Sequence, residues 1–338
     1  MSSIVITRHI AVLGAGSWGT ALAILLARNG LQVRLWGHES QHMERLERAR
    51  ENKEFLPGFV LPASVVITDE LKAALSDVSE VLIVVPSHAF ATVLRTSESL
   101  MSTHTGISWA TKGFNPSDNR LLHHIAAEIL GNNRKTAVIS GPTFAKEVAA
   151  GLPTAVTVAS VDHDYAKQVS SYLHSKRLRA YTSDDIVGVQ VGGAAKNVLA
   201  IAAGIADGLG FGANTRAALI TRGLVELTRL GLALGGKANT FNGLAGLGDL
   251  ALTCTDNQSR NRRFGVLLAQ GITTNQACQQ IGQEVEGVIT AKSVFNQSQQ
   301  LGLEMPICEQ VYKIIYEHIA PLQAVETLLD RVAKTELN

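Results

Sequence analysis

A lysine within an apolar segment is the residue in this sequence best suited to acid–base chemistry. Lys196 and Asn197 interrupt a run of small and apolar residues between Gly192 and Gly204. An ammonium group is costly to bury unless it faces a cleft or a partner, and desolvation lowers a lysine pKa from its usual value of about 10.4. Lys196 is therefore a candidate proton donor and acceptor, with Asn197 placed to fix the amine or a substrate hydroxyl. The alternative is a lysine that extends from the helix into solvent.

A polar cluster later in the chain has the composition of an anion site. The run TCTDNQSRNRRFG covers residues 253–265. Ser259 suits the N-cap of a helix, and Arg260 follows at a position where a guanidinium and free backbone amides can bind one phosphate together. The pattern predicts a site for a phosphorylated substrate. The alternative is a solvated basic face, which Arg262 and Arg263 would form.

Two segments of the first half place polar groups where strands are expected to end. ATKG puts Lys112 in position to meet a substrate phosphate or to orient a carbonyl, although exposed lysines are common at such places. ISGPTFAKE offers the backbone of Gly141 and the hydroxyl of Thr143 to a small polar ligand. Alternatively, Thr143 is the N-cap of a helix over residues 144–150.

Three carboxylates in the second half accompany these cations. Asp249 lies in AGLGDL, which we interpret as a glycine-rich turn, and it can bond the ammonium of Lys196, bond a substrate hydroxyl or cap a helix. Glu284 and Glu286 alternate in GQEVEGVIT. Glu286 can bond hydroxyl or amide groups of a cofactor, and the alternative is a charged turn before the next helix.

The glycine-rich run near the N-terminus predicts a dinucleotide site. Five strand-like residues lead directly into Gly14, Gly16 and Gly19, spaced G-x-G-x-x-G, and a long apolar helix follows. In such a unit the first glycine permits the tight turn, the second lets the pyrophosphate approach, and the third lets helix and strand pack closely. Ser17 and Trp18 lie inside this loop and are expected near the pyrophosphate, although Trp18 also suits a packing role.

The end of the second expected strand bears on the choice between NAD and NADP. NAD-binding units usually carry an acidic residue there, which takes the ribose hydroxyls. This strand instead ends in Gly37 and His38, and Glu39 comes one or two residues late. Without the acid a 2′-phosphate is not repelled, and His38 or Arg45 can attract it. We therefore expect NADP to be accepted, with NAD as the other cofactor, unless His38 is only a surface turn residue.

The elements that position these residues divide the chain into two predicted domains. Strands rich in Val and Ile alternate with helices through the first half, which predicts an α/β fold with a doubly wound Rossmann sheet. The expected strands are Ile10–Leu13, Gln32–Trp36, Val81–Val85, Ile107–Ala110, Ala137–Ile139 and Thr154–Ala159. Beyond about Asp185 helical spacing takes over, so we predict a dinucleotide-binding domain over residues 1–185 and an all-helical substrate domain over residues 186–338.

Composition excludes several other classes. The formal net charge of +1 gives no general attraction to nucleic acid or membrane, and we expect no partner of either kind. Three widely spaced cysteines suggest free thiols in a reducing cytosol, with neither disulfides nor a metal site. The first residues lack the apolar stretch of a signal peptide, and the apolar run nearest to a membrane span is broken by Asp207. A soluble cytoplasmic protein is expected.

Taken in order, these motifs resemble those of the bacterial-type NAD(P)-dependent glycerol-3-phosphate dehydrogenases. The series is GAGSWGTALA, VVPSHAF, ATKG, SGPTFAKE, GLPTA, GGAAKN, AGLGDL, CTDNQSRNRRFG and VEG, and it extends from about Ile10 to Leu329. The resemblance implies reversible reduction of dihydroxyacetone phosphate to sn-glycerol 3-phosphate by NADPH or NADH. It also implies a cytoplasmic homodimer that supplies phospholipid synthesis.

The resemblance further implies a role for each matching residue. Lys196 would be the catalytic acid–base residue. Substrate contacts would come from Lys112, Gly141, Thr143, Lys196, Asp249, Ser259, Arg260 and Asn261. Cofactor contacts would come from Gly14, Gly16, Ser17, Trp18, Gly19, His38, Lys112, Ala145, Arg260, Glu284 and Glu286. The family usually has an apolar residue where Glu284 stands, which argues against a side-chain role there.

Two other classes of protein fit parts of the pattern. Another two-domain dehydrogenase, acting on a hydroxy acid, would share the fold but would need a clamp for a carboxylate. A dinucleotide sensor without catalysis would have no reason to keep Lys196 and Arg260 beside a crevice.

Overall fold

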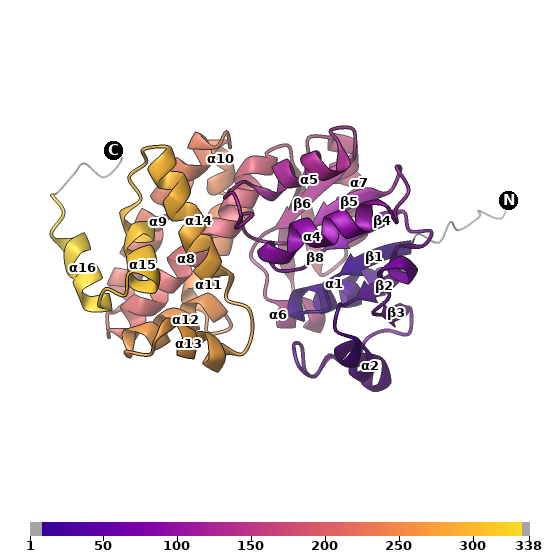
Figure 1. Ribbon diagram of the computed structural model, residues 1–338, viewed down its shortest axis with the longest axis horizontal. Coiled ribbons are helices and arrows are strands. Elements are labelled where there is room, and N and C mark those ends of the chain that lie inside the picture. The colour runs from indigo at the N-terminus through magenta and orange to yellow at the C-terminus, as the bar shows by residue number, and fades with distance from the viewer. Residues whose placement is uncertain (1–8, 333–338) are drawn as a thin grey trace.

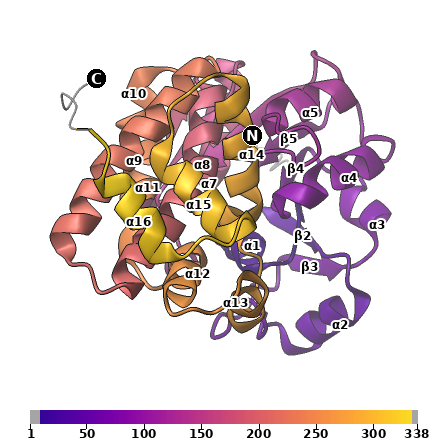
Figure 2. The ribbon, with the colours of Figure 1, turned by 60° about the vertical axis from the view of Figure 1, so that its left-hand side comes forward.

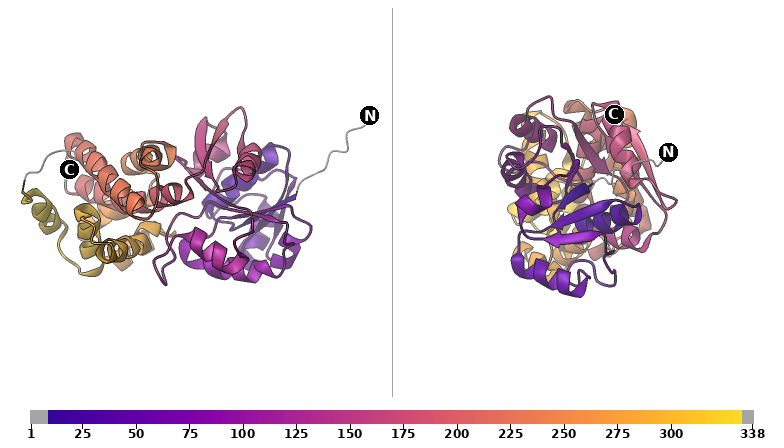
Figure 3. Two further views of the ribbon diagram at one scale, coloured as in Figure 1. Left: turned by 90° about the horizontal axis from the view of Figure 1, so that it is seen from above. Right: turned by 90° about the vertical axis from the view of Figure 1, so that its right-hand side faces the viewer.

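A computed structural model describes residues 9–332 of the chain. It consists of two lobes placed end to end, a sheet-containing lobe formed by the first half and a helical lobe formed by the second (Figures 1 and 3). The sheet has eight strands in the order β3-β2-β1-β4-β5-β6-β7-β8, and the first six follow the strand order of a dinucleotide-binding Rossmann domain. The predicted fold class is confirmed.

Successive apolar side chains of the central strands point to opposite faces of the sheet, which explains why helices cover both faces. In β1, Ile10 and Val12 enter the core beneath α1, whereas Ala11 and Leu13 enter the core on the opposite face. The strands are β1 (His9–Leu13), β2 (Gln32–Trp36), β3 (Val65–Thr68), β4 (Glu80–Ile83), β5 (Gly106–Trp109), β6 (Thr136–Ser140), β7 (Thr154–Ala159) and β8 (Leu178–Ser183). The helices of this lobe are α1 (Ser17–Arg28), α2 (Ser40–Ala49), α3 (Leu71–Leu75), α4 (Ser87–Glu98), α5 (Leu122–Leu130), α6 (Ala145–Ala150) and α7 (His163–Leu173).

The far end of the sheet departs from the sequence-based expectation. β7 runs antiparallel to β6, and β8 then pairs parallel with β7. The strands β3 and β8 were not predicted. Both are edge strands with exposed positions, such as Val66 and Tyr181, so they lack the continuous apolar runs of the central strands.

The helical lobe is organised around one long helix, α8 (Ile186–Gly208). This helix is long and apolar enough to cross a membrane, but 94% of its apolar 18-residue stretch is buried inside the protein, so it is a core helix. The other elements of this lobe are α9 (Ala213–Ala233), α10 (Ala238–Phe241), η1 (Leu244–Gly248), α11 (Asp249–Thr255), α12 (Arg260–Ala269), α13 (Thr274–Ile281), α14 (Glu286–Gln300), α15 (Pro306–Tyr316) and α16 (Pro321–Leu329). All but α13 and α16 pack directly against α8. Figure 2 shows α15 and α16 lying across one side of this lobe.

Three local expectations need correction. Asp249 does not lie in a turn, because the π-helical turn η1 leads directly into α11 and Asp249 is the first residue of that helix. Thr143 is not a helix cap, since the N-cap of α6 is Phe144, without a side-chain cap. Helical spacing in the sequence predicts a last helix over Gln323–Lys334, but α16 ends at Leu329, and residues 333–338 lie outside the described part of the chain.

Candidate active site

A cleft of about 870 Å³ receives side chains from both lobes. It brings together most of the residues that the sequence singled out. The predicted residues that line it are Gly14, Gly16, Ser17, Trp18, His38, Lys112, Thr143, Ala145, Lys196, Ser259, Arg260, Asn261, Glu284 and Glu286. The other predicted residues, Gly19, Gly141 and Asp249, support this lining from behind, as their contacts show below.

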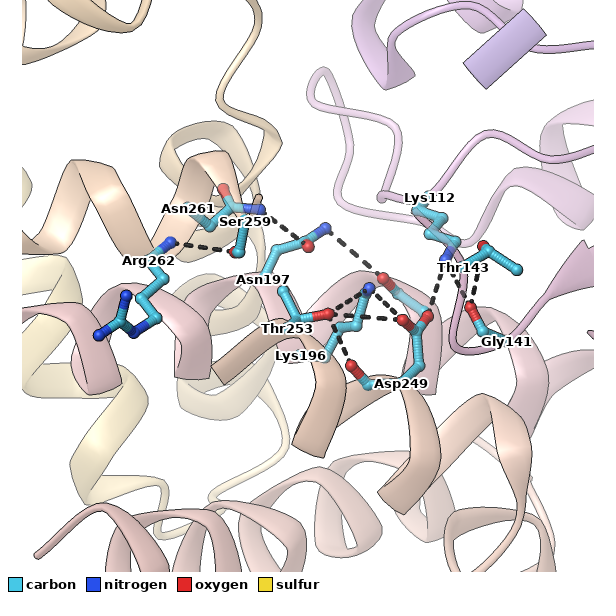
Figure 4. Close-up of polar contacts among 11 residues, drawn as sticks. Lys112, Gly141, Thr143, Lys196, Asn197, Asp249, Thr253, Ser259, Asn261 and Arg262 are labelled. Atoms are coloured by element: carbon cyan, nitrogen blue, oxygen red, sulfur yellow. Dashed lines mark hydrogen bonds and ion pairs between the residues drawn. The ribbon is translucent and has the colours of Figure 1, made fainter. Parts of the chain in front are cut away.

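Two lysines from different lobes share one buried carboxylate at the centre of the site (Figure 4). Lys196 on α8 donates to Oδ1 of Asp249, and Lys112, which follows β5, donates to Oδ2 at 2.7 Å. The side chain of Asp249 is fully buried. Nζ of Lys196 also donates to Oγ1 of Thr253 at 2.7 Å, and that hydroxyl donates to the carbonyl of Asp249 at 2.6 Å. Lys196 is thus held by two acceptors on α11.

The surroundings of Lys196 bring its pKa close to neutrality. Burial lowers this pKa, the negative charge of Asp249 raises it and the positive charge of Lys112 lowers it, so that it falls from 10.5 to about 8. Lys196 is only 5% exposed and lines the cleft. An amine with such a pKa can both donate and accept a proton under physiological conditions.

Thr253 was missed in the sequence because the segment before it was interpreted as a turn. In a helix that begins at Asp249, a residue four positions later lies on the same face. An Asp-x-x-x-Thr spacing would therefore have pointed to Thr253 as a second acceptor for Lys196, had α11 been predicted.

Gly141 and Thr143 lie beside Lys112 at the end of β6. Nζ of Lys112 donates to the carbonyl of Gly141 at 3.2 Å, and the Thr143 hydroxyl donates to the same carbonyl at 3.2 Å. Gly141 has a φ of +147°, and a Cβ there would lie 3.0 Å from the backbone of Val156. The backbone at this point needs glycine, so the turn after β6 keeps the shape that supports Lys112.

The N-terminus of α12 supplies the expected anion-binding features. Ser259 is the N-cap, and its side chain accepts from the backbone N–H of Arg262. The backbone N–H groups of Arg260 and Asn261 lie in the first turn of α12, where the helix itself supplies no carbonyl acceptors. They are therefore available to an anion. The Arg260 guanidinium lines the same cleft. Burial lowers its pKa, whereas Glu286 and Glu284 raise it.

The side chain of Asn261 is engaged within the protein. Its Nδ2 donates to Oδ1 of Asn197 at 2.9 Å, and its Oδ1 accepts from the N–H of Gly287 at 2.9 Å. Substrate contact by Asn261 would therefore come from its backbone amide. Asn197, which the sequence placed to fix the amine or a substrate hydroxyl, lines the cleft and joins α8 to α12 through Asn261.

Arg262 is not part of a solvated basic face. It is largely buried and forms an ion pair with Asp207 at the end of α8, 2.5 Å from the carboxylate. Asp207 also pairs with Arg216 at 2.6 Å, and Arg262 bonds Asn257 in the loop before α12. These contacts tie the loop that carries Ser259 to the end of α8. Arg263 is exposed at the cleft.

The glycine loop fits the pyrophosphate of a dinucleotide. A Cβ on Gly16 would meet nothing within 4 Å, so the space above this residue is open to a ligand. Gly14 has a φ of +121°, and a Cβ on Gly19 would lie 1.8 Å from the carbonyl oxygen of Gly14. The first turn of α1 has no side-chain cap and no acidic residue, so its amides can bind phosphate. Buried Asn52 braces the loop by donating to the carbonyl of Ala15 at 2.8 Å.

At the end of β2, Gly37 and His38 occupy the usual ribose position, and Glu39 lines the cleft directly after them. His38 is highly exposed, and its Nε2 lies 3.6 Å from Oε1 of Glu39. The sequence did not point to His42 and Phe55, which also line this end and meet edge to face with ring centroids 5.1 Å apart. These residues are brought in by α2 and by the loop after it, and a motif search around the glycines does not cover them.

Glu284 and Glu286 differ in their surroundings. Glu284 is exposed at the edge of the cleft. Both oxygens of Glu286 accept from Ser87, the first residue of α4: Oε1 from its N–H and Oε2 from its hydroxyl, each at 2.8 Å. Of the two carboxylates, Glu286 is therefore the one that joins the lobes.

Comparisons with known proteins agree with this architecture over both halves of the chain. Residues 9–166 match the family described as NAD-dependent glycerol-3-phosphate dehydrogenase N-terminus, and residues 185–326 match the corresponding C-terminus. A glycerol-3-phosphate dehydrogenase [NAD(P)+] from Shewanella halifaxensis is 54% identical over 331 residues, covering 98% of each chain. One from Aeromonas hydrophila is 55% identical over 328 residues, covering 97% of this chain and 98% of the relative.

A solved structure gives the same result for the fold. The crystal structure of glycerol-3-phosphate dehydrogenase from Coxiella burnetii superposes with a TM-score of 0.94 at 50% identity, covering 96% of this chain and 99% of the other. With a dinucleotide loop, a shared lysine–aspartate centre and relatives above half identity along nearly its whole length, this chain belongs to the NAD-dependent glycerol-3-phosphate dehydrogenase family.

Proposed function

We propose that the protein reduces dihydroxyacetone phosphate to sn-glycerol 3-phosphate, reversibly, with NADPH or NADH. The observation that carries this proposal is the convergence of Lys196 and Lys112 on buried Asp249, at the cleft that the glycine loop and Arg260 also line. Other two-domain hydroxyacid dehydrogenases and sensors without catalysis are not favoured, because the chain matches this family over both halves.

In the proposed mechanism the glycine loop and the first amides of α1 would hold the dinucleotide, whose reduced nicotinamide would supply a hydride for the carbonyl carbon of the substrate. The ammonium of Lys196 stabilises the negative charge that develops on the carbonyl oxygen and donates a proton to it from Nζ. Asp249 and Thr253 orient this ammonium, and in the reverse direction neutral Lys196 accepts the hydroxyl proton. Lys112 adds a second positive charge next to the same carboxylate.

The phosphate of the substrate is assigned to the start of α12. The guanidinium of Arg260 and the first amides of the helix bind it, with Ser259 shaping the turn. Gly141, Thr143 and Asn261 complete the substrate site in this proposal. Ser17, Trp18, His38, Ala145 and Glu284 face the cofactor along the cleft, together with Gly14, Gly16, Lys112, Arg260 and Glu286, and Gly19 supports the loop from behind.

The remaining parts of the proposal concern the setting of the enzyme. We infer a cytoplasmic homodimer without membrane insertion or nucleic-acid binding, and a product that enters phospholipid synthesis. The family resemblance supports this setting, and size-exclusion chromatography with light scattering tests the dimer.

The decisive experiment follows NADPH absorbance with different ketones. Dihydroxyacetone phosphate should be reduced, whereas unphosphorylated dihydroxyacetone and 2-ketoacids should react far more slowly because they lack the phosphate that Arg260 binds. Lys196→Ala should abolish turnover and leave NADPH affinity nearly unchanged, as measured by fluorescence. Equal rates with a ketoacid, or near-normal turnover by Lys196→Ala, would contradict the proposal.

A further inference from the structure

The contact between Glu286 and Ser87 joins the two lobes at a partly buried point on the cleft. Glu286 is the first residue of α14 in the helical lobe, and Ser87 is the first residue of α4 in the sheet lobe. Ser87 is 1% exposed, and both oxygens of Glu286 accept from it. Since the carboxylate also lies at the N-terminus of α4, the dipole of that helix favours its negative charge.

This contact is packed against the segment that carries Lys112. A Cβ on Gly113 would lie 2.5 Å from Cβ of Ser87 and 3.2 Å from Oε2 of Glu286. Gly113 thus lets the backbone after Lys112 approach the pair directly. A displacement of Glu286 would therefore change the packing at Gly113, the residue that follows Lys112.

In the other direction, hydrogen bonds continue from Glu286 to the helix of Lys196. The N–H of Gly287 donates to Asn261, and Asn261 donates to Asn197, the neighbour of Lys196. The series of contacts therefore extends from the start of α4, through α14 and α12, to the middle of α8. It connects the segments that hold the two lysines independently of Asp249.

A second contact near the other end of α14 supports the same arrangement. Nε2 of Gln297 donates to the carbonyl of Asn119 in the sheet lobe at 2.8 Å. In Figures 1 and 2, α14 lies on the side of the helical lobe that faces the sheet lobe. By contrast, Gln258 and Glu147, which also bridge the lobes, are bonded at the exposed surface. Exposed polar contacts contribute little to holding two bodies together.

We propose that Glu286 is a positioning residue: by binding both donors of Ser87 it fixes the helical lobe against α4 and so sets the placement of Lys196 and Arg260 relative to Lys112. The inference rests on the proposed function, because the substrate site is the part that both lobes must build. In the proposed function Glu286 also faces the cofactor, so Ser87→Ala, which keeps the carboxylate, separates the two roles: it should weaken the substrate site and leave cofactor binding nearly unchanged.

The test compares variants that separate the charge of Glu286 from its hydrogen bonds. Glu286→Gln removes the charge, but the amide can still accept from the Ser87 N–H and donate to its hydroxyl. Glu286→Ala removes both bonds, and Ser87→Ala removes one without altering Glu286. Glu147→Ala is the matched control, since it removes a carboxylate whose bond with Gln258 also bridges the lobes, at the exposed surface and outside the cleft lining. Each is compared by dihydroxyacetone phosphate kinetics, NADPH fluorescence titration and small-angle X-ray scattering.

We expect Glu286→Ala to lower kcat/KM for dihydroxyacetone phosphate about 30-fold, mainly through KM, and Ser87→Ala to lower it about fivefold. The double variant should match Glu286→Ala alone, because the two side chains act through one contact. Glu286→Gln should remain within about threefold of the wild type. The NADPH affinity of Ser87→Ala should change less than about threefold, any loss of NADPH affinity in Glu286→Ala should be smaller than its loss of kcat/KM, and the radius of gyration should increase only where both bonds are lost.

Three results would overturn the proposal. The first is a Glu286→Gln variant as impaired as Glu286→Ala, with NADPH affinity reduced to match, which would assign the carboxylate to the cofactor by its charge. The second is additive effects of Ser87→Ala and Glu286→Ala, and the third is a coupling of Ser87 to Glu147 as large as its coupling to Glu286. A wild-type enzyme that does not reduce dihydroxyacetone phosphate would refute the proposed function instead, and scattering and NADPH titration would still report on the contact.

Discussion

Replacing Asp249 with asparagine should move the pH dependence of the reaction through its effect on Lys196. Reduction needs the ammonium form of Lys196 as proton donor, and its pKa is about 8. In the wild type the rate of reduction should therefore be constant at neutral pH and fall as pH rises through about 8. Oxidation of glycerol 3-phosphate needs the neutral amine, so its rate should rise over the same range.

The size of the shift follows from the loss of one buried negative charge. Two unit charges about 4 Å apart interact by about 4 kcal/mol at an effective dielectric constant of 20, which corresponds to roughly three pKa units. Asp249 divides its carboxylate between Lys196 and Lys112, so we expect the pKa of Lys196 to fall by roughly one to two units in Asp249→Asn. The descending limb for reduction should move to lower pH by that amount.

The assay is the initial rate of NADPH oxidation from about pH 6 to about pH 10, with kcat and kcat/KM measured at each pH. Thr253→Val is the matched control, because it removes a neutral acceptor of Lys196 and leaves the charges in place. Its limb should shift much less than that of Asp249→Asn. If Asp249→Asn retains measurable turnover with its limb still near pH 8, Asp249 does not govern the protonation of Lys196.

Three further changes test other parts of the structure. Arg260→Ala should raise KM for dihydroxyacetone phosphate about 100-fold with a smaller change in kcat, because charge-assisted bonds to the phosphate are lost. Steady-state kinetics measures both constants, with Arg260→Lys as the control. An unchanged KM in Arg260→Ala would contradict the assignment of Arg260 to the phosphate. Gly19→Ala should weaken NADPH binding and lower the free energy of unfolding by about 1–3 kcal/mol, since the added Cβ would lie 1.8 Å from the carbonyl oxygen of Gly14. Fluorescence titration measures the NADPH affinity, and urea melts measure the free energy of unfolding. Burial raises the pKa of Glu226 from 4.5 to about 7. Between pH 4.5 and about pH 7 the folded chain binds one proton more than the unfolded chain, so the free energy of unfolding should fall by about 3 kcal/mol as pH rises through this range. Urea melts measure this slope, and Glu226→Gln should abolish it. A slope that persists in Glu226→Gln would contradict its assignment to the buried Glu226.

The central strands and the long helices could be predicted because burial imposes a pattern on them. The prediction Gln32–Trp36 coincides with β2, and Thr154–Ala159 coincides with β7. The edge strands and the short helices α3 and α10 were missed because exposure on one side leaves them no distinctive apolar pattern. The reversal of β7 has no local signature either, since its direction depends on tertiary packing.

Candidate site residues were predictable where a motif carries its own mechanism, as in the glycine loop, and where a charge stands in an apolar run, as at Lys196. Their partners were harder to find. Thr253 required the correct periodicity of α11, and the bond between Glu286 and Ser87 joins residues 199 positions apart. A contact of that kind depends on how the lobes pack, and the local sequence around either residue does not specify it.

The small residues of α8 explain how one helix gathers a site from three distant segments. A Cβ on Gly192 would lie 2.2 Å from the carbonyl oxygen of Ala245 in η1, just before Asp249. A Cβ on Gly193 would lie 2.6 Å from Oγ of Ser140, the residue before Gly141, and one on Gly204 would lie 1.9 Å from the carbonyl oxygen of Arg262 in α12. Each glycine therefore allows a neighbouring segment to approach α8 more closely than any side chain would permit. The lysine that we assign to proton transfer lies within the same stretch of α8, so the glycines that surround it in the sequence also bring its partners within reach.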